Sequence, residues 1–265
     1  MDLGLKGKVV VITGGSQGIG KAAALEFARE GCQVCICARR QERLDAAKAE
    51  FAELGFDLYT CAVDVTDFAG MQAFADAVVE KYGRIDVWVN NAAVNQYKLL
   101  LDYSVEEFQN LINTDLVSVF ACSKIAALHM KKTGGGVIIQ GSSLASTAPT
   151  AGRSPYAACK SGIMSLTRTM AAEFAPYHIR VVAYVPGLIR TELTAEGISK
   201  FGENMLKDIP MKRFGEPEDL GKAIVFLASD DAAGYINGVG LEISGAKRSV
   251  QNPWYAYDFV DKEFR

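Results

Sequence analysis

The sequence predicts an α/β fold in which one parallel sheet is covered by helices on both faces. Short, almost wholly apolar runs alternate with helical stretches, a glycine-rich turn follows the first run, and no linker or repeat divides the 265 residues. Apolar runs separated by helices are typical of parallel strands buried on both faces. A chain of this length is near the upper size of one α/β domain, so we expect a single domain over residues 1–265.

Short runs rich in β-branched residues are the expected strands. They are Val9–Ile12, Val34–Cys37, Leu58–Val63, Ile85–Val89, Val137–Ile139, Val181–Val185 and Val239–Ile243. The expected helices are Ile19–Arg29, Glu42–Leu54, Met71–Lys81, Val105–Met130, Pro155–Phe174 and Glu218–Leu227. This alternation predicts a single doubly wound, Rossmann-type domain with a seven-stranded parallel sheet, whose ligands bind at the carboxyl ends of the strands.

Composition excludes some classes of function. The hydrophobic share is 49%, the charged share is 22% and the net charge is -3, so we expect no broad basic surface for nucleic acid. Residues 1–7 lack the long apolar run of a leader, and no later run approaches the roughly 20 apolar residues of a membrane span. We therefore expect a soluble, cytoplasmic protein that binds neither nucleic acid nor membrane.

Cysteine spacing raises the question of a metal site. Cys32, Cys35 and Cys37 stand close together, but no second cysteine pair or nearby histidine completes a zinc set. The histidines of the chain are His129 and His178. We expect these cysteines to be small buried hydrophobes of a reduced protein, with no metal bound.

A glycine-rich turn follows the first expected strand. In GGSQGIGKA, Gly15 and Gly20 have the spacing of a P-loop, but Ala22 stands where that loop needs a hydroxyl for magnesium. One register earlier, Gly14, Gly18 and Gly20 form a pattern suited to the pyrophosphate of a dinucleotide. The turn leads into a helix, whose first N–H groups and dipole favour such an anion.

A second motif lies far downstream, in SPYAACKSG. Tyr156 and Lys160 are four residues apart, with Pro155 suited to the first turn of the helix that carries them. Both side chains therefore lie on one face of that helix. Because a neighbouring ammonium favours the phenolate, this pair can act as a general acid/base.

Two further motifs complete an ordered set. GSSLAS places Ser143 thirteen residues before Tyr156, and NNAA ends the preceding expected strand at residues 90–93. With these motifs the chain resembles the short-chain dehydrogenase/reductase family over residues 13–245, close to its 3-oxoacyl reductases and hydroxysteroid dehydrogenases. The resemblance implies hydride transfer between nicotinamide C4 and a carbinol or carbonyl carbon.

The resemblance also assigns the site residues. Tyr156 would be the general acid/base, Ser143 the hydrogen-bond partner of the substrate oxygen, and Asn113, in LINTDL, the helix residue that helps to retain a water. Lys160 would hold the nicotinamide ribose and assist Tyr156. The residues expected to bind the cofactor are Gly14, Ser16, Gln17, Gly18, Ile19, Gly20, Arg39, Arg40, Asp64, Val65, Asn91, Ala92, Tyr156, Lys160, Pro186, Gly187, Ile189 and Thr191.

Three positions depart from the family pattern. Ala93 replaces the glycine of the usual NNAG motif, Val182 stands where many members have asparagine, and ISGA at residues 243–246 replaces a motif that contains aspartate. These changes concern structural support. None of them removes a catalytic side chain.

The end of the second expected strand indicates the cofactor. A site that prefers NAD carries an acidic residue there, whereas this chain has Arg39 and Arg40 after Ala38. A guanidinium suits the 2'-phosphate of NADP. We therefore expect NADP(H) over NAD(H), although Gln17 departs from the basic residue of some NADP users and the arginines could be solvated loop residues.

The substrate is less defined. Ala93, Val94, Leu144 and Leu188 lie near the expected reaction centre and favour a fairly apolar ketone or secondary alcohol, such as a hydroxysteroid. A 3-oxoacyl thioester or a polyol stays open. Two other classes of function stay open as well, a P-loop NTPase and a dinucleotide-binding sensor without catalysis.

Two segments complete the prediction. Over residues 191–214, apolar side chains at helical spacing indicate a substrate lid or an ordinary packed helix. In the tail, residues 247–265, Trp254, Tyr255, Tyr257 and Phe259 carry more apolar surface than a free end usually exposes. We expect this tail to dock on its own domain or at an interface of the homotetramer, or homodimer, that the resemblance implies.

Overall fold

The computed structural model describes residues 2–251 and residue 257, and its centre is a sheet in the order β3-β2-β1-β4-β5-β6-β7. All of the strand pairs in this sheet are parallel. The strands are β1 (Val9–Thr13), β2 (Gln33–Ala38), β3 (Leu58–Ala62), β4 (Val87–Asn90), β5 (Gly136–Gly141), β6 (Ile179–Pro186) and β7 (Gly240–Ile243). The predicted fold class is confirmed, since every expected strand overlaps an observed one.

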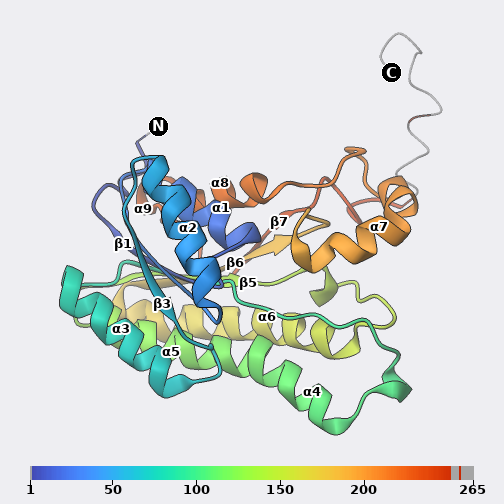
Figure 1. Cartoon of the computed structure of the whole chain (residues 1–265), viewed down its shortest axis with the longest axis horizontal. Helices are drawn as coiled ribbons and strands as arrows, with labels where there is room; N and C mark the ends of the chain where they lie inside the picture. The colour runs from blue at the N-terminus through green and yellow to red at the C-terminus, as the bar shows by residue number, and fades with distance from the viewer. Residues whose placement is uncertain (1, 252–256, 258–265) are drawn as a thin grey trace.

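Helices cover both faces of the sheet (Figure 1). They are α1 (Gly18–Arg29), α2 (Gln41–Glu53), α3 (Phe68–Tyr82), α4 (Val105–Ile112), α5 (Ser118–Met130), α6 (Ser154–Phe174), α7 (Glu192–Lys207), α8 (Pro217–Ala228) and α9 (Asp230–Ala233). Figure 1 shows α1, α2 and α8 on one side and α3, α5 and α6 on the other. This is the three-layer arrangement of a doubly wound fold.

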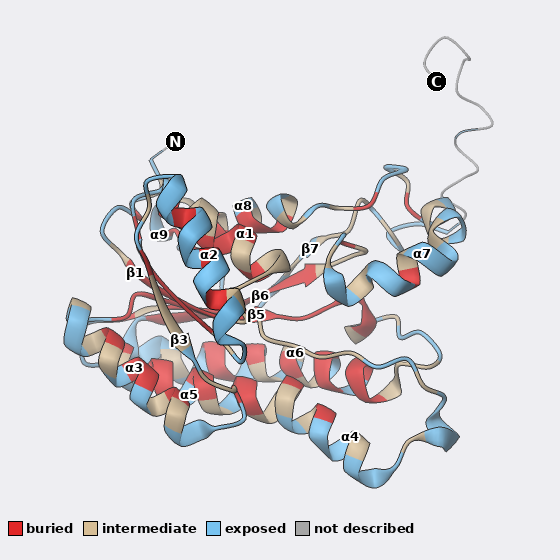
Figure 2. Ribbon diagram, in the orientation of Figure 1, coloured by how far each residue is buried: buried red, intermediate tan, exposed pale blue. Residues whose placement is uncertain are grey.

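Alternate residues of each central strand belong to opposite cores. Val10 and Ile12 of β1 pack in the core beneath α1 and α8, whereas Val9 and Val11 pack in the core on the side of α3 and α5. Figure 2 shows the buried residues along the sheet and on the helix faces turned toward it. A strand buried on both faces reads as a continuous apolar run, which is why VVVI was recognisable in the sequence.

The strand order reverses beside β1. This strand pairs with β2 on one side and with β4 on the other, so successive connections leave toward opposite edges of the sheet. In such sheets a crevice forms at the carboxyl ends of the strands where the order reverses, and ligands bind there. The fold therefore places a ligand site after β1, β4 and β5.

The expected helix Val105–Met130 differs in the structure. A π-turn at Asn113–Val117 separates α4 from α5. Contrary to the expectation of no apolar run of membrane length, Val105–Met130 is long and apolar enough by length and composition, with a mean hydropathy of 1.5 in its most apolar window. Half of that window is buried, and α5 packs on β4 and β5 between α3 and α6, so the segment is a core helix of this fold.

The clustered cysteines are buried, unbridged thiols. Cys35 and Cys37 lie in β2, and Cys32 precedes it. Burial raises the pKa of Cys32 and Cys35 to about 12, which keeps these thiols protonated at neutral pH. Within residues 2–251 and residue 257, no group of three or more His, Cys, Asp or Glu side chains is arranged to hold a metal ion.

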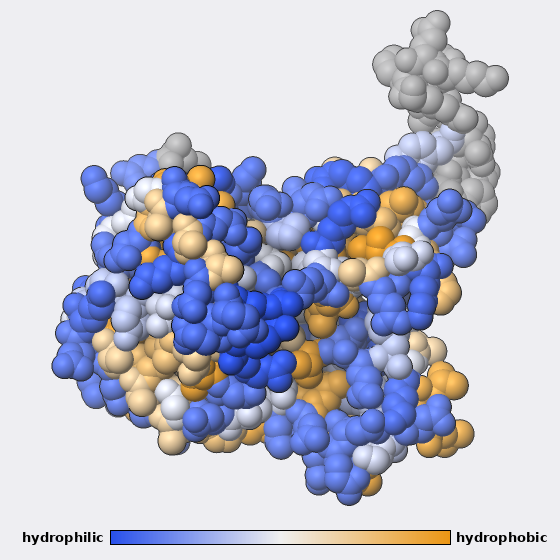
Figure 3. Space-filling view, in the orientation of Figure 1, coloured by the Kyte–Doolittle hydropathy of each residue, from blue (hydrophilic) through white to orange (hydrophobic). Residues whose placement is uncertain are grey.

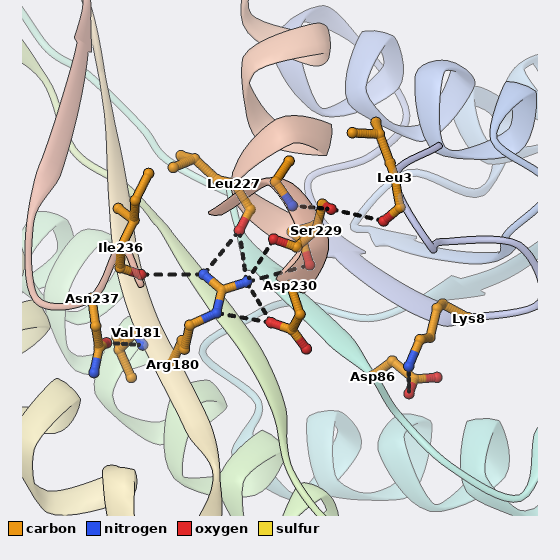
Figure 4. Close-up of polar contacts among 12 residues, drawn as sticks. Leu3, Lys8, Asp86, Arg180, Val181, Leu227, Ser229, Asp230, Ile236 and Asn237 are labelled. Carbon is orange, nitrogen blue, oxygen red and sulfur yellow. Dashed lines mark hydrogen bonds and ion pairs between the residues drawn. The ribbon is translucent and has the colours of Figure 1, made fainter. Parts of the chain in front are cut away.

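Arg180 organises a polar cluster at the amino end of β6 (Figure 4). Its Nε donates to Oδ1 of Asp230 at 2.9 Å, and its Nη1 donates to the carbonyl oxygens of Leu227 at 3.1 Å and Ile236 at 3.2 Å. Nη2 donates to Leu227 and also to Ser229. Since Leu227 lies in the last turn of α8, the cation also sits where the helix dipole favours it.

Candidate active site

The glycine-rich turn between β1 and α1 forms one wall of a pocket. Gly14 and Gly18 have φ values of 64° and 54°, in the left-handed region that favours glycine. A Cβ on Gly20 would lie 2.4 Å from the amide nitrogen of Asn91 and 2.5 Å from the carbonyl oxygen of Gly14, so a larger residue does not fit there. Because no side chain caps α1, the N–H groups of its first turn stay available to an anion.

Thr13 and Asn91 join this turn to the NNAA segment after β4. Thr13 Oγ1 accepts from the N–H groups of Asn91 and Ala92, both at 3.0 Å, while Asn91 Nδ2 donates to the carbonyl oxygen of Thr13 at 2.9 Å. The hydroxyl of Tyr184 on β6 donates to Asn91 Oδ1 at 2.9 Å, and burial raises the pKa of Tyr184, which keeps it a donor. These bonds fix the ends of β1, β4 and β6 relative to one another.

Arg39 and Arg40 line the same pocket at the end of β2. Arg39 Nη1 lies 3.9 Å from Oδ2 of Asp64, and Arg40 Nη2 donates to Gln17 Oε1 at 3.5 Å. The Arg39 side chain is 67% exposed, so its pairing with Asp64 is weak. Both guanidinium groups therefore keep donors available for a ligand.

Tyr156 and Lys160 project from α6 into the pocket and are almost fully buried. Lys160 Nζ lies 5.3 Å from the centroid of the Tyr156 ring and donates to the carbonyl oxygen of Gly141 at 3.0 Å. Ser142 Oγ donates to the carbonyl oxygen of Lys160 at 3.1 Å. These bonds to the end of β5 hold the ammonium beside the phenol, as a general acid/base pair requires.

The structure corrects the assignment of Asn113. Asn113 is exposed and lines a separate small hollow, whereas Asp115 is fully buried beside the pocket. Asp115 Oδ1 accepts from the N–H of Val94 at 2.8 Å, and its Oδ2 lies 3.7 Å from Lys160 Nζ. Successive helical residues are rotated by about 100°, so residues two apart point in different directions. The helix therefore presents Asp115 to the site, and not Asn113.

Asp115 places a buried carboxyl group next to the lysine. Burial raises the pKa of this carboxyl, and the ammonium of Lys160 opposes that rise. Oδ2 accepts no hydrogen bond from the part of the chain that the structure describes. Since a buried oxygen without a partner is costly, its nearest compensation is the charge of Lys160.

Ser143 lies where β5 ends and lines the pocket with Tyr156. Its Oγ accepts from the N–H of Ala145 at 3.1 Å, which leaves its hydroxyl hydrogen free to donate. Of the apolar residues expected near the reaction centre, Leu144 is buried outside the pocket lining. The others, Ala93, Val94 and Leu188, line it.

Most of the residues predicted to bind the cofactor line this one pocket. Gly20 is an exception, because it packs behind the turn against Asn91. The others are Gly14, Ser16, Gln17, Gly18, Ile19, Arg39, Arg40, Asp64, Val65, Asn91, Ala92, Tyr156, Lys160, Pro186, Gly187, Ile189 and Thr191.

Helix α7 occupies the segment where a lid is predicted. Its first turn, with Glu192 and Leu193, lines the pocket, and Glu192 pairs with Arg43 of α2 at 2.7 Å. Ile209, just after the helix, is buried, whereas Phe201 is 56% exposed. The space-filling view shows apolar surface between α7 and α4 (Figure 3). Whether α7 moves as a lid stays a prediction.

Sequence reasoning missed several residues of the pocket, among them Arg153, Tyr184 and Glu192. The sequence did hold a signal for Arg153, because it precedes Tyr156 by three residues and Lys160 by seven, which is the spacing of one helix face. Tyr184 and Glu192 gave no such signal. Their partners, Asn91 and Arg43, lie far away in the sequence.

The predicted docking of the tail falls mainly on residues outside the described ones, including Trp254, Tyr255 and Phe259. Tyr257 is described. Its hydroxyl donates to the carbonyl oxygen of Pro210 in the same chain, and Lys212 Nζ lies 4.8 Å from its ring centroid. An interface role for the tail stays a prediction.

Comparison with known proteins identifies the family. A model described as short chain dehydrogenase matches residues 8–200, which contain the glycine-rich turn, Ser143, Tyr156 and Lys160. The chain belongs to the short-chain dehydrogenase family. As a member, it is an NAD(P)-dependent oxidoreductase that acts on the CH–OH groups of small molecules.

Its relatives within the family differ in substrate. The chain is 38% identical over 251 residues to a 3alpha-hydroxysteroid dehydrogenase of Mediterraneibacter gnavus, covering 94% of this chain and 100% of that protein. It is 39% identical over 241 residues to a 3-oxoacyl-(acyl-carrier-protein) reductase of Thermotoga maritima, covering 91% and 98%. A gluconate 5-dehydrogenase of Burkholderia cenocepacia, solved with NADP and tartrate, superposes with a TM-score of 0.87 at 30% identity, covering 92% and 96%.

Proposed function

We propose that this short-chain dehydrogenase interconverts a secondary alcohol and a ketone with NADP(H), with Tyr156 as the general acid/base. The observation that carries the proposal is the grouping of Ser143, Tyr156 and Lys160 in the same pocket as the glycine-rich turn of residues 14–20. A nucleoside-triphosphatase is disfavoured by Ala22. A sensor without catalysis is disfavoured by the buried, ordered Tyr156 and Lys160 pair.

Each side chain has a task in this reaction. When bound, the nicotinamide supplies or accepts the hydride. Tyr156 donates its phenolic proton to the carbonyl oxygen as the ketone is reduced, and takes a proton from the alcohol in the reverse direction. Ser143 donates a hydrogen bond to the same oxygen. Lys160 favours the phenolate by its charge, and Asp115 helps to hold that charge in place.

The pocket supports NADP(H) as the cofactor. The free N–H groups at the start of α1 suit a pyrophosphate, and the exposed guanidinium of Arg39 suits a 2'-phosphate. Asp64, which pairs with Arg39, is available to help position the Arg39 guanidinium. The solved gluconate 5-dehydrogenase contains NADP, which agrees with this choice.

Exchange of Arg39 for Asp tests the cofactor proposal. The variant removes the attraction for the 2'-phosphate and adds an acceptor for ribose hydroxyls, so the preference for NADP(H) should reverse by roughly tenfold or more. Arg40→Ala should have a smaller effect. The measurement is kcat/KM with NADPH and NADH at fixed ionic strength, because exposed charges are screened. A parent that already prefers NADH would refute the proposal.

For the substrate, we propose a fairly apolar alcohol or ketone such as a hydroxysteroid. The apolar lining at Ala93, Val94 and Leu188 and the 38% identity to a hydroxysteroid dehydrogenase support it. A 3-oxoacyl thioester is the second candidate, supported by the 39% identity to a reductase of that class. A polyol is a third, supported by the gluconate 5-dehydrogenase.

We also propose that the protein works in the cytoplasm as a homotetramer or homodimer. Exposed apolar side chains on α5 support self-association, since Phe120 is 50% and Leu128 is 44% exposed. Light scattering measures the mass directly. A monomer at micromolar concentration would contradict this part of the proposal.

The activity itself is tested with a panel of steroid, thioester, polyol and simple cyclic ketones and alcohols, followed by nicotinamide absorbance with each cofactor. Turnover of at least one class with NADPH is expected. Binding of NADPH, seen as a change in its fluorescence, without turnover of any member would favour the sensor instead.

A further inference from the structure

Arg153 is a cation on the substrate side of the pocket. Its Cζ lies 4.5 Å from the ring centroid of Tyr156 and 5.0 Å from that of Tyr97. Its Nε donates to Oδ1 of Asn95 at 3.0 Å. These contacts come from the segment after β4 and from α6, and they fix the guanidinium beside the proposed general acid/base.

The terminal nitrogens of Arg153 are unused. Within the described part of the chain, neither nitrogen has a hydrogen-bond partner and no carboxylate pairs with the group. Arg190 shows the usual alternative: its Cζ lies 4.8 Å from the ring centroid of Phe214, and it also pairs with Glu216 at 3.2 Å. Arg153 has the ring contacts without the acid.

The rest of the pocket does not neutralise this charge. Among its lining residues, the carboxylates are Asp64 and Glu192, which pair with Arg39 at 3.9 Å and Arg43 at 2.7 Å. Asp64 follows β3, and Glu192 is the first residue of α7. A half-buried guanidinium without an acidic partner is costly to retain unless a ligand supplies the anion.

We propose that Arg153 binds a carboxylate carried by the substrate, within a few bonds of the reacting carbon. The two unused nitrogens can each donate one hydrogen bond, the fork that matches a carboxylate. Because the guanidinium lies against the ring of Tyr156, the carboxylate it holds lies near the carbon that Tyr156 serves. Together with Ala93, Val94 and Leu188, this indicates an oxo acid or hydroxy acid with an apolar body.

This inference rests on the proposed interconversion of an alcohol and a ketone, and it favours an acid with an apolar body over a neutral hydroxysteroid as the substrate. A neutral ketone would leave the donors of Arg153 unpaired in the occupied pocket, and a site built for hydrogen bonding discriminates strongly against a ligand that lacks the partner. The charge would accompany the apolar body of the substrate. It would not sit at the far end of a long molecule.

Paired ligands that differ only in charge test the proposal. The reduction of 3- and 4-oxocyclohexanecarboxylate is compared with that of the matching carboxamides and of cyclohexanone. In the parent, kcat/KM for the best carboxylate should exceed that for its amide by roughly ten- to a hundredfold. Arg153→Met should bring the ratio close to one, and Arg153→Lys should keep part of it.

Lys131→Met is the matched control, because Lys131 also contacts a tyrosine ring, that of Tyr177 at 5.0 Å, but lies outside the pocket. It should leave the carboxylate preference unchanged. If Arg153→Met lowers the turnover of carboxylate and amide equally, Arg153 acts through Tyr156 and the proposal is overturned. A parent without a carboxylate preference overturns it as well.

An unreactive pair separates this inference from the proposed function. Calorimetry with and without NADP⁺ compares cyclohexanecarboxylate with cyclohexanecarboxamide, and the carboxylate should bind at least tenfold more tightly to the parent but not to Arg153→Met. Selective binding without any ketone turnover would refute the proposed function and keep the inference. Turnover of cyclohexanone with no selectivity in either assay would do the reverse.

Discussion

Two buried cations at opposite ends of the sheet differ in how completely their surroundings satisfy them. Arg180, at the amino end of β6, has a partner for each of its three nitrogens, drawn from α8, α9 and the segment before β7. Lys160, near the carboxyl end of β5, donates to Gly141 and faces Asp115, whose Oδ2 has no hydrogen bond within residues 2–251 and residue 257.

The contrast separates a structural cluster from a reactive one. At Arg180 the protein provides every acceptor, so the group can only stabilise the fold. Around Lys160 some donors and acceptors beside the pocket have no protein partner. Groups that bind a ligand or transfer protons need such unused hydrogen-bonding capacity. The polar cluster at the amino ends of the strands is thus fully hydrogen-bonded, whereas the groups at their carboxyl ends keep unused bonds beside a pocket.

Tyr156→Phe should have the largest effect on kcat of the variants considered, with little effect on stability. The variant removes the proposed proton donor, so kcat should fall by roughly 10²- to 10⁴-fold. The phenol makes no hydrogen bond with the described part of the chain, so the midpoint of thermal unfolding and the affinity for NADPH should stay close to those of the parent. Steady-state kinetics, calorimetry and cofactor fluorescence measure the three quantities.

Tyr184→Phe is the matched control for that variant. It also removes a buried pocket hydroxyl, but one that is bonded to Asn91 at 2.9 Å. It should cost about 1 kcal/mol of unfolding free energy and reduce kcat much less than Tyr156→Phe. Equal losses of kcat in the two variants would deny Tyr156 its special role.

Arg180→Met should show the opposite pattern. Loss of the guanidinium leaves Asp230 without its cation and buried carbonyl oxygens of α8 without donors, so the free energy of unfolding should fall by about 3 kcal/mol. At a temperature where the variant is folded, kcat should stay near that of the parent. Urea denaturation provides the first number and kinetics the second.

Arg29→Met serves as the control for Arg180, because Arg29 is 51% exposed and pairs with Glu26 on its own helix. Its effect on unfolding should stay within about 0.5 kcal/mol. A loss of kcat in Arg180→Met as large as that in Tyr156→Phe would mean that the Arg180 cluster contributes to catalysis as well as to stability.

Asp115→Asn should have the smallest effect on the free energy of unfolding, and the size of this effect should depend on pH. Burial raises the pKa of Asp115, so between its ordinary pKa of about 3.9 and the raised value the folded state binds more protons than the unfolded state. The unfolding free energy contributed by Asp115 therefore falls as pH rises through that window. Asparagine does not titrate.

The unfolding free energy of Asp115→Asn minus that of the parent should consequently increase from pH 4 toward neutrality. Urea denaturation of both proteins across this range measures it, and taking the difference cancels the other carboxyl groups. A difference that stays constant with pH would show that the environment of Asp115 does not favour its protonated form.

The sequence allowed the sheet and most of the pocket to be predicted, because the signals for both are local. VVVIT is apolar throughout since β1 is buried on both faces, and the glycines of residues 14–20 are required by a turn that admits no larger side chain at Gly20. Tyr156 and Lys160 were found because four residues separate them on one helix.

The rest depended on geometry that local patterns do not encode. The π-turn at Asn113–Val117 is invisible in the continuous apolar pattern, and it contains both Asp115, which faces Lys160, and Asn113, which is exposed. The pairing of Glu192 with Arg43 joins residues far apart in the sequence. Arg153 could have been found from its spacing to Tyr156, but not its lack of an acidic partner.

The transfer of deuterium from the cofactor tests directly whether the pocket at the carboxyl ends of the strands catalyses hydride transfer. NADPH deuterated at C4 on either face is incubated with the best ketone of the panel, and the alcohol is analysed by mass spectrometry. One of the two deuterated cofactors should place a single deuterium on the carbinol carbon in the parent, at a rate reduced by roughly 10²-fold or more in Tyr156→Phe. Alcohol formed without deuterium from both cofactors would show that this pocket does not transfer the hydride, and labelling at an undiminished rate by Tyr156→Phe would show that Tyr156 is not the general acid.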